Sequence, residues 1–283
     1  MITVFRHTVR RFRGQVLGWG LALSLLVLMI VGVYDSIAEQ REQIEQLIAN
    51  YPPELMAFFG ASDSTFSMFT AEGFLAMEFF SLMPVVLGIF AVLMGSGLLV
   101  SDEEKGTLDL IMAHPVSRSA LFMGRLVAFV TATVGILAII WLAFIVTMNW
   151  STLSIGAADL AKPFLSLLAV LLLFSTLALL LSMVLPSRRL AASVSGLLLV
   201  ASYFVTVLAR INEDLETLAR FSPLNYYQTE HAFQRFNVQW FAGLLVVGWT
   251  RLMAFHFERL PKRPLLYREI AVPGGKEPAR AAS

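Results

Sequence analysis

The side chains best able to do chemistry gather in one polar segment, Ser101–Arg125, which lies between two long uncharged apolar runs. The segment holds seven charges: Asp102, Glu103, Glu104, Lys105, Asp109, Arg118 and Arg125. Carboxylates and guanidinium groups can form charge-assisted hydrogen bonds with a second polar surface. Because the carboxylates outnumber the bases, which a purely topogenic loop does not require, we predict that the segment faces water and a partner protein. The alternative interpretation is a solvated loop whose charges only fix the topology.

Local signals within this segment predict two helices. Ser101 followed by Glu104 has the S-x-x-E spacing of a capping box, which predicts a helix that begins there. Pro115 would end that helix, because the residue before a proline is disfavoured in the α region. Ser117 could cap a second helix that continues into the next apolar run. We therefore expect a short amphipathic helix over Asp102–His114, held between two apolar helices.

The elements that must hold this segment are rich in hydrocarbon. Of the 283 residues, 57% are hydrophobic and 14% are charged, against roughly 25% charged in soluble domains. A helix that crosses a bilayer needs about 20 apolar residues. Five uncharged runs meet this need: Leu17–Tyr34, Phe79–Val100, Leu126–Trp150, Pro163–Leu185 and Leu190–Ala209. A sixth run, Val238–Phe257, is interrupted by Arg251 and His256. We predict an all-α polytopic membrane protein with six transmembrane helices and a short cytoplasmic helix between spans two and three.

The distribution of basic residues predicts the orientation. With the amino terminus inside, most of the 21 Lys and Arg residues fall in inside segments, as the positive-inside rule describes. We therefore expect both termini and the segment Ser101–Arg125 in the cytoplasm, and the protein as a multi-pass component of a cell (plasma or inner) membrane.

Three regions follow from these patterns. Residues 1–16 alternate bulky apolar with basic residues. This is typical of an amphipathic helix that lies on the inner leaflet before turning into the first span, and a basic stop signal is the alternative. Residues 17–260 form the six-span transmembrane domain. Residues 261–283 are polar and rich in Pro and Gly, and we expect a disordered cytoplasmic tail.

Several classes of site find no support in the sequence. The chain has no cysteine, so disulfides and thiolate metal sites are impossible. Its four histidines are scattered, so we predict no catalytic residue, no metal site and no enzymatic activity. No G-x-x-x-x-G-K-[ST] loop occurs, so ATP is not bound in the Walker manner and an ATPase must be another chain. We predict no cofactor and no nucleic-acid partner for this chain.

At the polar segment the sequence resembles a known family. The residues concerned are Glu103-Glu104-Lys105-Gly106-Thr107-Leu108, then Leu110, then Pro115-Val116-Ser117-Arg118. They are similar to the cytoplasmic signature of type-2 ABC transporter permease subunits, approximately E-x-x-x-G-T-L, a few apolar residues, and then P-V-S/T-R. The resemblance extends to the six spans, the cytoplasmic ends and the basic amino-terminal helix. The interrupted last span departs from the longer uncharged run usual in the family.

The resemblance implies that the segment is a coupling helix that docks into a cleft of a nucleotide-binding subunit. Its candidate contacts are Glu103, Glu104, Gly106, Thr107, Pro115 and Arg118. The resemblance also implies a permease subunit of an ATP-driven exporter. Two permeases, as a homodimer or a heterodimer, would pair within membrane lipid with two ATPase subunits that bind ATP and Mg²⁺. The alternatives are an ion-coupled secondary transporter and a non-transporting membrane scaffold or sensor. The mostly apolar spans allow a hydrophobic drug, a peptide or a lipid-like substrate.

The second span carries three further signals. Glu72 and Glu78 lie at its beginning and could contact a substrate or an ion at the outer mouth. The alternative is an interfacial anchor, because a carboxylate is favoured at the amino end of a helix. Pro84 within the span frees a backbone carbonyl and predicts a kink.

Two pairs of small residues predict close helix contacts. Ala91/Gly95 and Ala192/Gly196 both have small-xxx-small spacing. We expect them to pack within one bundle, and a homodimer seam is the alternative.

Overall fold

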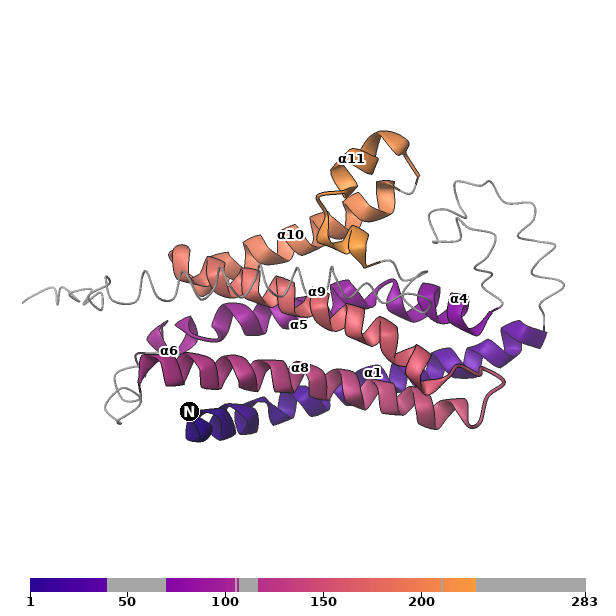
Figure 1. Cartoon of the computed structure of the whole chain (residues 1–283), viewed down its shortest axis with the longest axis horizontal. Coiled ribbons are helices and arrows are strands. Elements are labelled where there is room, and N and C mark those ends of the chain that lie inside the picture. Colours follow the sequence, from indigo (N-terminus) through magenta and orange to yellow (C-terminus); the bar gives the residue numbers. More distant parts are fainter. Residues whose placement is uncertain (40–69, 105, 107–116, 210, 228–283) are drawn as a thin grey trace, which may run out of the picture.

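Helices make up the regular structure of this chain. Figure 1 shows its computed structural model, which describes residues 1–39, 70–104, 106, 117–209 and 211–227. Within these ranges there are helices and turns but no strand. The long elements are α1 (Ile2–Glu39), α5 (Met83–Gly97), α8 (Arg118–Met148), α9 (Ala157–Val184) and α10 (Arg188–Ala209). The predicted all-α class is confirmed for the described residues.

Four helices are long and apolar enough to cross a bilayer, and a bent pair of helices adds a fifth span if it is counted as one. The four cover Ile2–Ser36, Ser119–Met148, Ala157–Val184 and Arg188–Ala209, and the bent pair joins Ala71–Phe80 to Met83–Gly97. Each overlaps one of the first five predicted runs, which supports a multi-pass membrane protein. The predicted sixth run, Val238–Phe257, and the predicted tail over 261–283 lie outside the described residues.

The first helix is uninterrupted. α1 unites the predicted interface helix over 1–16 with the first span in one element of 38 residues. The turn expected between them is not formed, because the helix contains no proline to break it. The hydroxyls of Thr8 and Ser24 also donate back to carbonyls of the same helix, at 2.8 and 2.7 Å. The amino-terminal basic residues therefore belong to the same unbroken helix as the first span.

The second span is broken. Thr70 caps α4 (Ala71–Leu75), which passes into the π-helical turn η1 (Ala76–Phe80), and α5 then begins at Met83. Pro84 lies in the first turn of α5, where a missing N–H is tolerated. The two halves meet at 40°, so the predicted kink at Pro84 is confirmed.

The spans pack in two groups. α1 lies along α8, while α5 lies along α9 and is flanked by α10 (Figure 1). A Cβ added to Gly95 of α5 would collide with the main chain of Ser175 in α9, so the glycine allows these helices to approach closely. The predicted contact at Ala91/Gly95 is therefore confirmed within the bundle. A Cβ added to Gly196 would meet nothing within 4 Å, so this glycine marks no close contact among the described residues.

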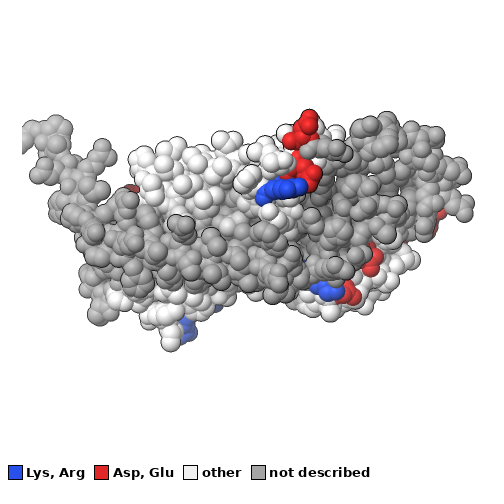
Figure 2. Space-filling view, turned by 45° about the horizontal axis from the view of Figure 1, so that its top comes forward, with Lys and Arg blue, Asp and Glu red and all other residues white. Residues whose placement is uncertain are grey.

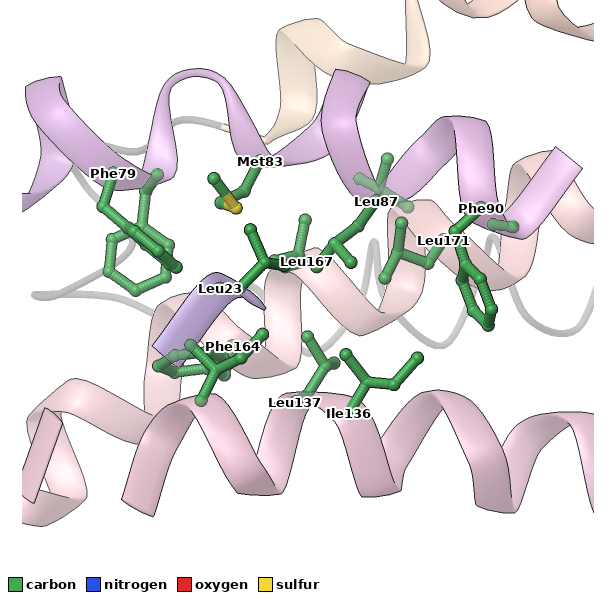
Figure 3. Close-up of a cluster of buried hydrophobic side chains, with 14 of the residues drawn as sticks. Leu23, Phe79, Met83, Leu87, Phe90, Ile136, Leu137, Phe164, Leu167 and Leu171 are labelled. Carbon is green, nitrogen blue, oxygen red and sulfur yellow. The ribbon is translucent and has the colours of Figure 1, made fainter. Parts of the chain in front are cut away.

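An aromatic cluster fills the core between the two groups. Phe79 and Phe80 of η1 meet Phe144 of α8 and Phe164 of α9, and all four are buried. The ring centroids of Phe79 and Phe144 are 5.0 Å apart and those of Phe80 and Phe164 are 5.2 Å apart, both in edge-to-face geometry. Figure 3 shows how leucine and isoleucine side chains of α1, α5, α8 and α9 extend the cluster along the bundle. Close packing of this kind holds spans together in lipid.

The described surface is largely uncharged. In the described part of the face seen in Figure 2, most residues are white and the coloured Lys, Arg, Asp and Glu residues form a few small groups. Large apolar side chains are exposed along several helices, among them Leu21 of α1 at 63% and Leu197 of α10 at 69%. Apolar exposure on this scale is expected of helices that face lipid.

Candidate functional site

The described ends of the polar segment lie at the end of the bundle where the chain begins (Figure 1). There the carboxyl end of α5, the short helix α6 (Val100–Glu104), the start of α8 and the start of α10 come together. We call this the insert end of the bundle, and we call the end that carries α4 the opposite end.

The first helix of the segment differs from the prediction. Ser101 lies inside α6, which begins at Val100, so it is not the non-helical residue that a capping box requires. α6 ends at Glu104, and Gly106 follows in a left-handed conformation with φ 66°. An uninterrupted helix over Asp102–His114 is therefore wrong, because a left-handed residue ends an α-helix. A Cβ on Gly106 would meet no atom of the described residues within 4 Å, so among them its φ, rather than a close approach, requires the glycine.

The second helix of the segment begins as predicted. Ser117 has an extended backbone, and its Oγ accepts a hydrogen bond from the Ala120 N–H at 3.2 Å. This contact satisfies one of the N–H groups that the first turn of a helix leaves unpaired. The cap at Ser117 is confirmed, and the segment re-enters the bundle through a well-defined helix start.

A buried ion pair joins the two ends of the segment. The Asp102 carboxylate in α6 pairs with the Arg125 guanidinium in α8, and the two residues are only 5% and 7% exposed. Arg125 also donates through Nη1 to the Leu98 carbonyl at 3.0 Å. Arg11 of α1 places its Nη1 3.5 Å from the other Asp102 oxygen. Buried charges are stable only when they are paired and hydrogen-bonded, so this cluster holds α1, α5, α6 and α8 in one arrangement.

A second cluster connects the segment to α10. The Glu104 Oε1 accepts the main-chain N–H of Arg188, the first residue of α10, at 2.9 Å. The amino end of a helix leaves such N–H groups without partners and favours negative charge. The Arg188 guanidinium donates to the Leu93 carbonyl of α5 at 3.1 Å and covers Gly97, where a Cβ would clash with it. Glu104 and Arg188 thereby tie the last turn of α6 to both α10 and α5.

The two clusters are suited to a mechanical role. Arg125 and Arg188 both donate to carbonyls near the carboxyl end of α5, where the helix dipole favours positive charge. Within the described ranges, no group of three or more His, Asp or Glu residues is placed to hold a metal ion. The two clusters link the polar segment to α1, α5, α8 and α10. A displacement of the segment would act on these four helices through these contacts.

The predicted coupling contacts are only partly described. Two of them lie outside the described residues: Thr107 and Pro115. The others lie at the edges of the segment: Glu103 and Glu104 in α6, Gly106 after it, and Arg118 at the start of α8. Glu104 is exposed but already bonded to α10, which the sequence did not indicate.

Sequence reasoning missed the residues that hold the segment in place. The sequence shows Asp102 and Arg125 as charges of the segment, and its local patterns indicate no partner for Arg11 or Arg188. One signal was available: Asp102 and Arg125 lie where the polar segment meets the two apolar runs. Opposite charges at two such boundaries indicate a pair across the segment.

The two acids predicted at the outer mouth lie in the broken second span. Glu72 is half-buried in the first turn of α4, beside the Thr70 cap, whose Oγ1 accepts the Gly73 N–H at 3.1 Å. This position in the first turn is electrostatically favourable for a carboxylate. Glu78 is exposed in η1.

A match to a known protein family covers most of the chain. A family model described as ABC-2 family transporter protein matches residues 2–248, which includes every helix described above and the polar segment. No curated protein and no solved structure showed significant similarity to the chain. The match confirms the resemblance that the polar segment carries. The chain belongs to the ABC-2 family of transporter proteins, as a membrane permease of the ABC type.

Proposed function

We propose that this chain is the membrane-spanning subunit of an ATP-driven exporter, and that a separate ATPase subunit moves it by pushing on the segment Ser101–Arg125. Family membership supports a permease and implies an ATPase partner. The observation that carries the proposal is the buried pair between Asp102 and Arg125, because it makes the two ends of the segment move as one.

The helices attached to the segment are suited to carry a displacement. α8 has 31 residues, which corresponds to about 46 Å at 1.5 Å per residue, so a push at its start acts across the whole bilayer. The Asp102–Arg125 pair would move α6 and the end of α5 together with α8. α10 would follow through the contact between Glu104 and Arg188. Closure of the ATPase against the segment would thus tilt the second and third spans and open a path outward.

The remaining features of the proposal follow from family membership and sequence. The contacts with the ATPase would come from Glu103, Glu104, Gly106, Thr107, Pro115 and Arg118. ATP and Mg²⁺ would be bound by that partner, and two permeases would pair as a homodimer or a heterodimer. Both termini would lie in the cytoplasm. Glu72 and Glu78 would face a substrate or an ion at the outer mouth.

Affinity purification of the tagged full chain from its native membrane tests the partner. We expect a second chain that carries a Walker motif to co-purify. Glu103→Ala should weaken this co-purification, while Glu216→Ala should not, because Glu216 is an exposed acid in α11 (Glu216–Ala219), away from the segment. If no Walker-motif chain accompanies the wild-type protein, the proposed function is wrong.

ATP hydrolysis by the purified complex tests the coupling. Glu104→Ala is a poor single probe, because it also removes the contact with the start of α10. Glu103→Ala and Thr107→Ala are therefore compared in the same assay, with Glu216→Ala as the control. We expect a loss of hydrolysis in the first two variants only. Equal hydrolysis in all three would overturn the assignment of the segment as the coupling element.

A further inference from the structure

One face of α1 carries arginines followed by leucines. Arg6, Arg10 and Arg13 are all exposed, and their i, i+4, i+7 spacing places them on one side of a helix. The same side continues with Leu17 and Leu21, which are 54% and 63% exposed. Because α1 is uninterrupted from Ile2 onward, the charged and apolar parts of this face form one continuous stripe.

The length of the stripe matches one leaflet of a bilayer. The exposed leucines run from Leu17 to Leu28, which is 47% exposed. Eleven helical steps correspond to about 16 Å, and half of the hydrocarbon core of a bilayer is about 15 Å. The leucines therefore fill one leaflet. Arg13 lies about 6 Å beyond Leu17 along the helix, at the depth of the headgroups, and Arg10 and Arg6 lie about 10 and 16 Å beyond Leu17, further out on the same face. Arginine side chains can reach into that layer while their stems stay on apolar surface.

The three arginines have no acidic partner in the described part of the chain. The ion pairs found there use other bases, such as Arg11 and Arg125 on Asp102. A guanidinium group binds a phosphate through two parallel hydrogen bonds. Three such groups on one face attract anionic lipid headgroups more strongly than zwitterionic ones.

We propose that Arg6, Arg10 and Arg13 bind the phosphate groups of anionic phospholipids in the leaflet at the insert end. The same helical turns reach the buried ion pair on another side, because Arg11 contacts Asp102 and Phe12 is buried. Lipid bound to the arginines steadies these turns and, through Arg11, the pair that holds the polar segment. The inference goes beyond the proposed transport function and requires no ATPase.

Reconstitution of the full chain in nanodiscs tests this inference. One set of nanodiscs contains phosphatidylcholine only, and the other contains phosphatidylcholine and phosphatidylglycerol. The thermal midpoint of unfolding is followed by tryptophan fluorescence, and the lipids retained by the chain are counted by native mass spectrometry. We expect phosphatidylglycerol to raise the midpoint of the wild-type chain and to be retained preferentially. The variant R6Q/R10Q/R13Q should lose most of both effects.

Three controls make the result specific. R6K/R10K/R13K keeps the charges and should keep most of the stabilisation, which assigns the effect to the positive charges. Arg189→Gln removes another exposed arginine at the insert end and should have little effect. Glycerol 3-phosphate in solution should not replace the lipid, because it lacks the acyl chains that the leucines contact.

Two outcomes would overturn the inference. The first is a full phosphatidylglycerol effect in R6Q/R10Q/R13Q, which would mean that the lipid binds elsewhere. The second is an unchanged lipid effect with a loss of co-purifying protein in that variant, which would assign the arginine face to a protein partner.

Discussion

The Tyr227 hydroxyl donates a hydrogen bond to the main-chain carbonyl of Phe80, 3.2 Å away, although the two residues are 147 positions apart. In a regular α-helix the Phe80 carbonyl would accept the N–H of residue 84. Residue 84 is a proline and has no N–H. The Tyr227 hydroxyl therefore replaces the donor that Pro84 removes, and it does so at the break in the second span.

The tyrosine is itself fixed to α10. It follows η3 (Pro223–Tyr226), and the preceding Ser222 donates through Oγ to the Ser202 carbonyl of α10 at 3.0 Å. At the other end of α10, the main-chain N–H of Arg188 donates to the Glu104 carboxylate. α10 thus bridges the polar segment at the insert end and the break near the opposite end. We expect this helix to be one of the routes by which the two regions influence each other.

Tyr227→Phe should destabilise the protein by about 0.5–1.5 kcal/mol, because it removes the buried hydrogen bond to the Phe80 carbonyl. Chemical or thermal unfolding in detergent, followed by tryptophan fluorescence, measures the change. Tyr226→Phe is the matched control, since the Tyr226 hydroxyl also donates to a main-chain carbonyl, that of Arg220 at 2.8 Å, but is exposed. Water can replace that bond, so the control should cost less. Equal losses in the two variants would contradict the assigned role.

The stability of the wild-type protein should fall at alkaline pH through the same side chain. Burial raises the pKa of Tyr227 above its ordinary value of 10.0, so the folded state keeps the phenol proton while the unfolded state loses it. The contribution of the Tyr227 phenol to the free energy of unfolding is therefore fully present below pH 10 and is lost as the pH rises above 10. Unfolding measured from pH 8 to 11 should show a steeper alkaline loss in the wild type than in Tyr227→Phe. Parallel curves would show that Tyr227 ionises in the folded state as it does in the unfolded state.

Pro84→Ala should make the Tyr227 hydroxyl dispensable. Alanine supplies the N–H that can pair with the Phe80 carbonyl, so removal of the hydroxyl then leaves no buried group unsatisfied. A double-mutant cycle over Pro84→Ala and Tyr227→Phe should show a coupling energy of roughly 0.5–3 kcal/mol, the range for residues that share one partner. Strictly additive losses of stability in the double variant would mean that the break in the second span persists for a reason other than Pro84.

The spans and the kink were predictable because their causes are local. A run of about 20 uncharged apolar residues, a proline within such a run, and a serine before a helix each act over a few neighbouring residues. Ser117 behaves as its sequence indicates for this reason. Ser101 does not, because Leu98 already has helical dihedral angles and α6 begins before the serine. A cap requires a non-helical residue, and the preceding span decides whether one exists.

The contacts of the candidate site were not predictable in the same way. Asp102 and Arg125 are 23 positions apart, and Glu104 and Arg188 are 84 apart. Which acid meets which base depends on how the spans pack. The sequence places Asp102 and Arg125 at the two boundaries of the segment, but no pattern in it pairs Glu104 with Arg188. The same holds for Tyr227 and Phe80. Local patterns located the polar segment, and the tertiary structure shows what holds it.

Gly95→Ala should separate α5 from α9. The new Cβ would collide with the main chain of Ser175, which cannot move aside as a flexible side chain would. Overpacking of this kind typically costs about 1–3 kcal/mol, and we expect a lower thermal midpoint and weaker transport. Gly196→Ala is the control, since no atom of the described part of the chain lies within 4 Å of its added Cβ. It should be neutral or slightly stabilising, because alanine favours the helix by about 0.8–1.0 kcal/mol. A thermal midpoint as high in Gly95→Ala as in Gly196→Ala would contradict the close approach of α5 and α9.

Asp102→Ala should be the most damaging single change at the insert end. It would leave the Arg125 guanidinium buried without its carboxylate, and breaking a buried pair in this way costs about 3–5 kcal/mol. Glu216→Ala is the control, because it removes the acid of an exposed pair with Arg220, and such pairs contribute about 1 kcal/mol or less.

The double variant Asp102→Leu/Arg125→Met removes both charges and fills similar volume, so its stability should return close to that of the wild type. Its ATP hydrolysis in the complex should nevertheless stay uncoupled from transport, since the charges that tie α6 to α8 are gone. Full coupling in this stable variant would show that the pair serves folding alone.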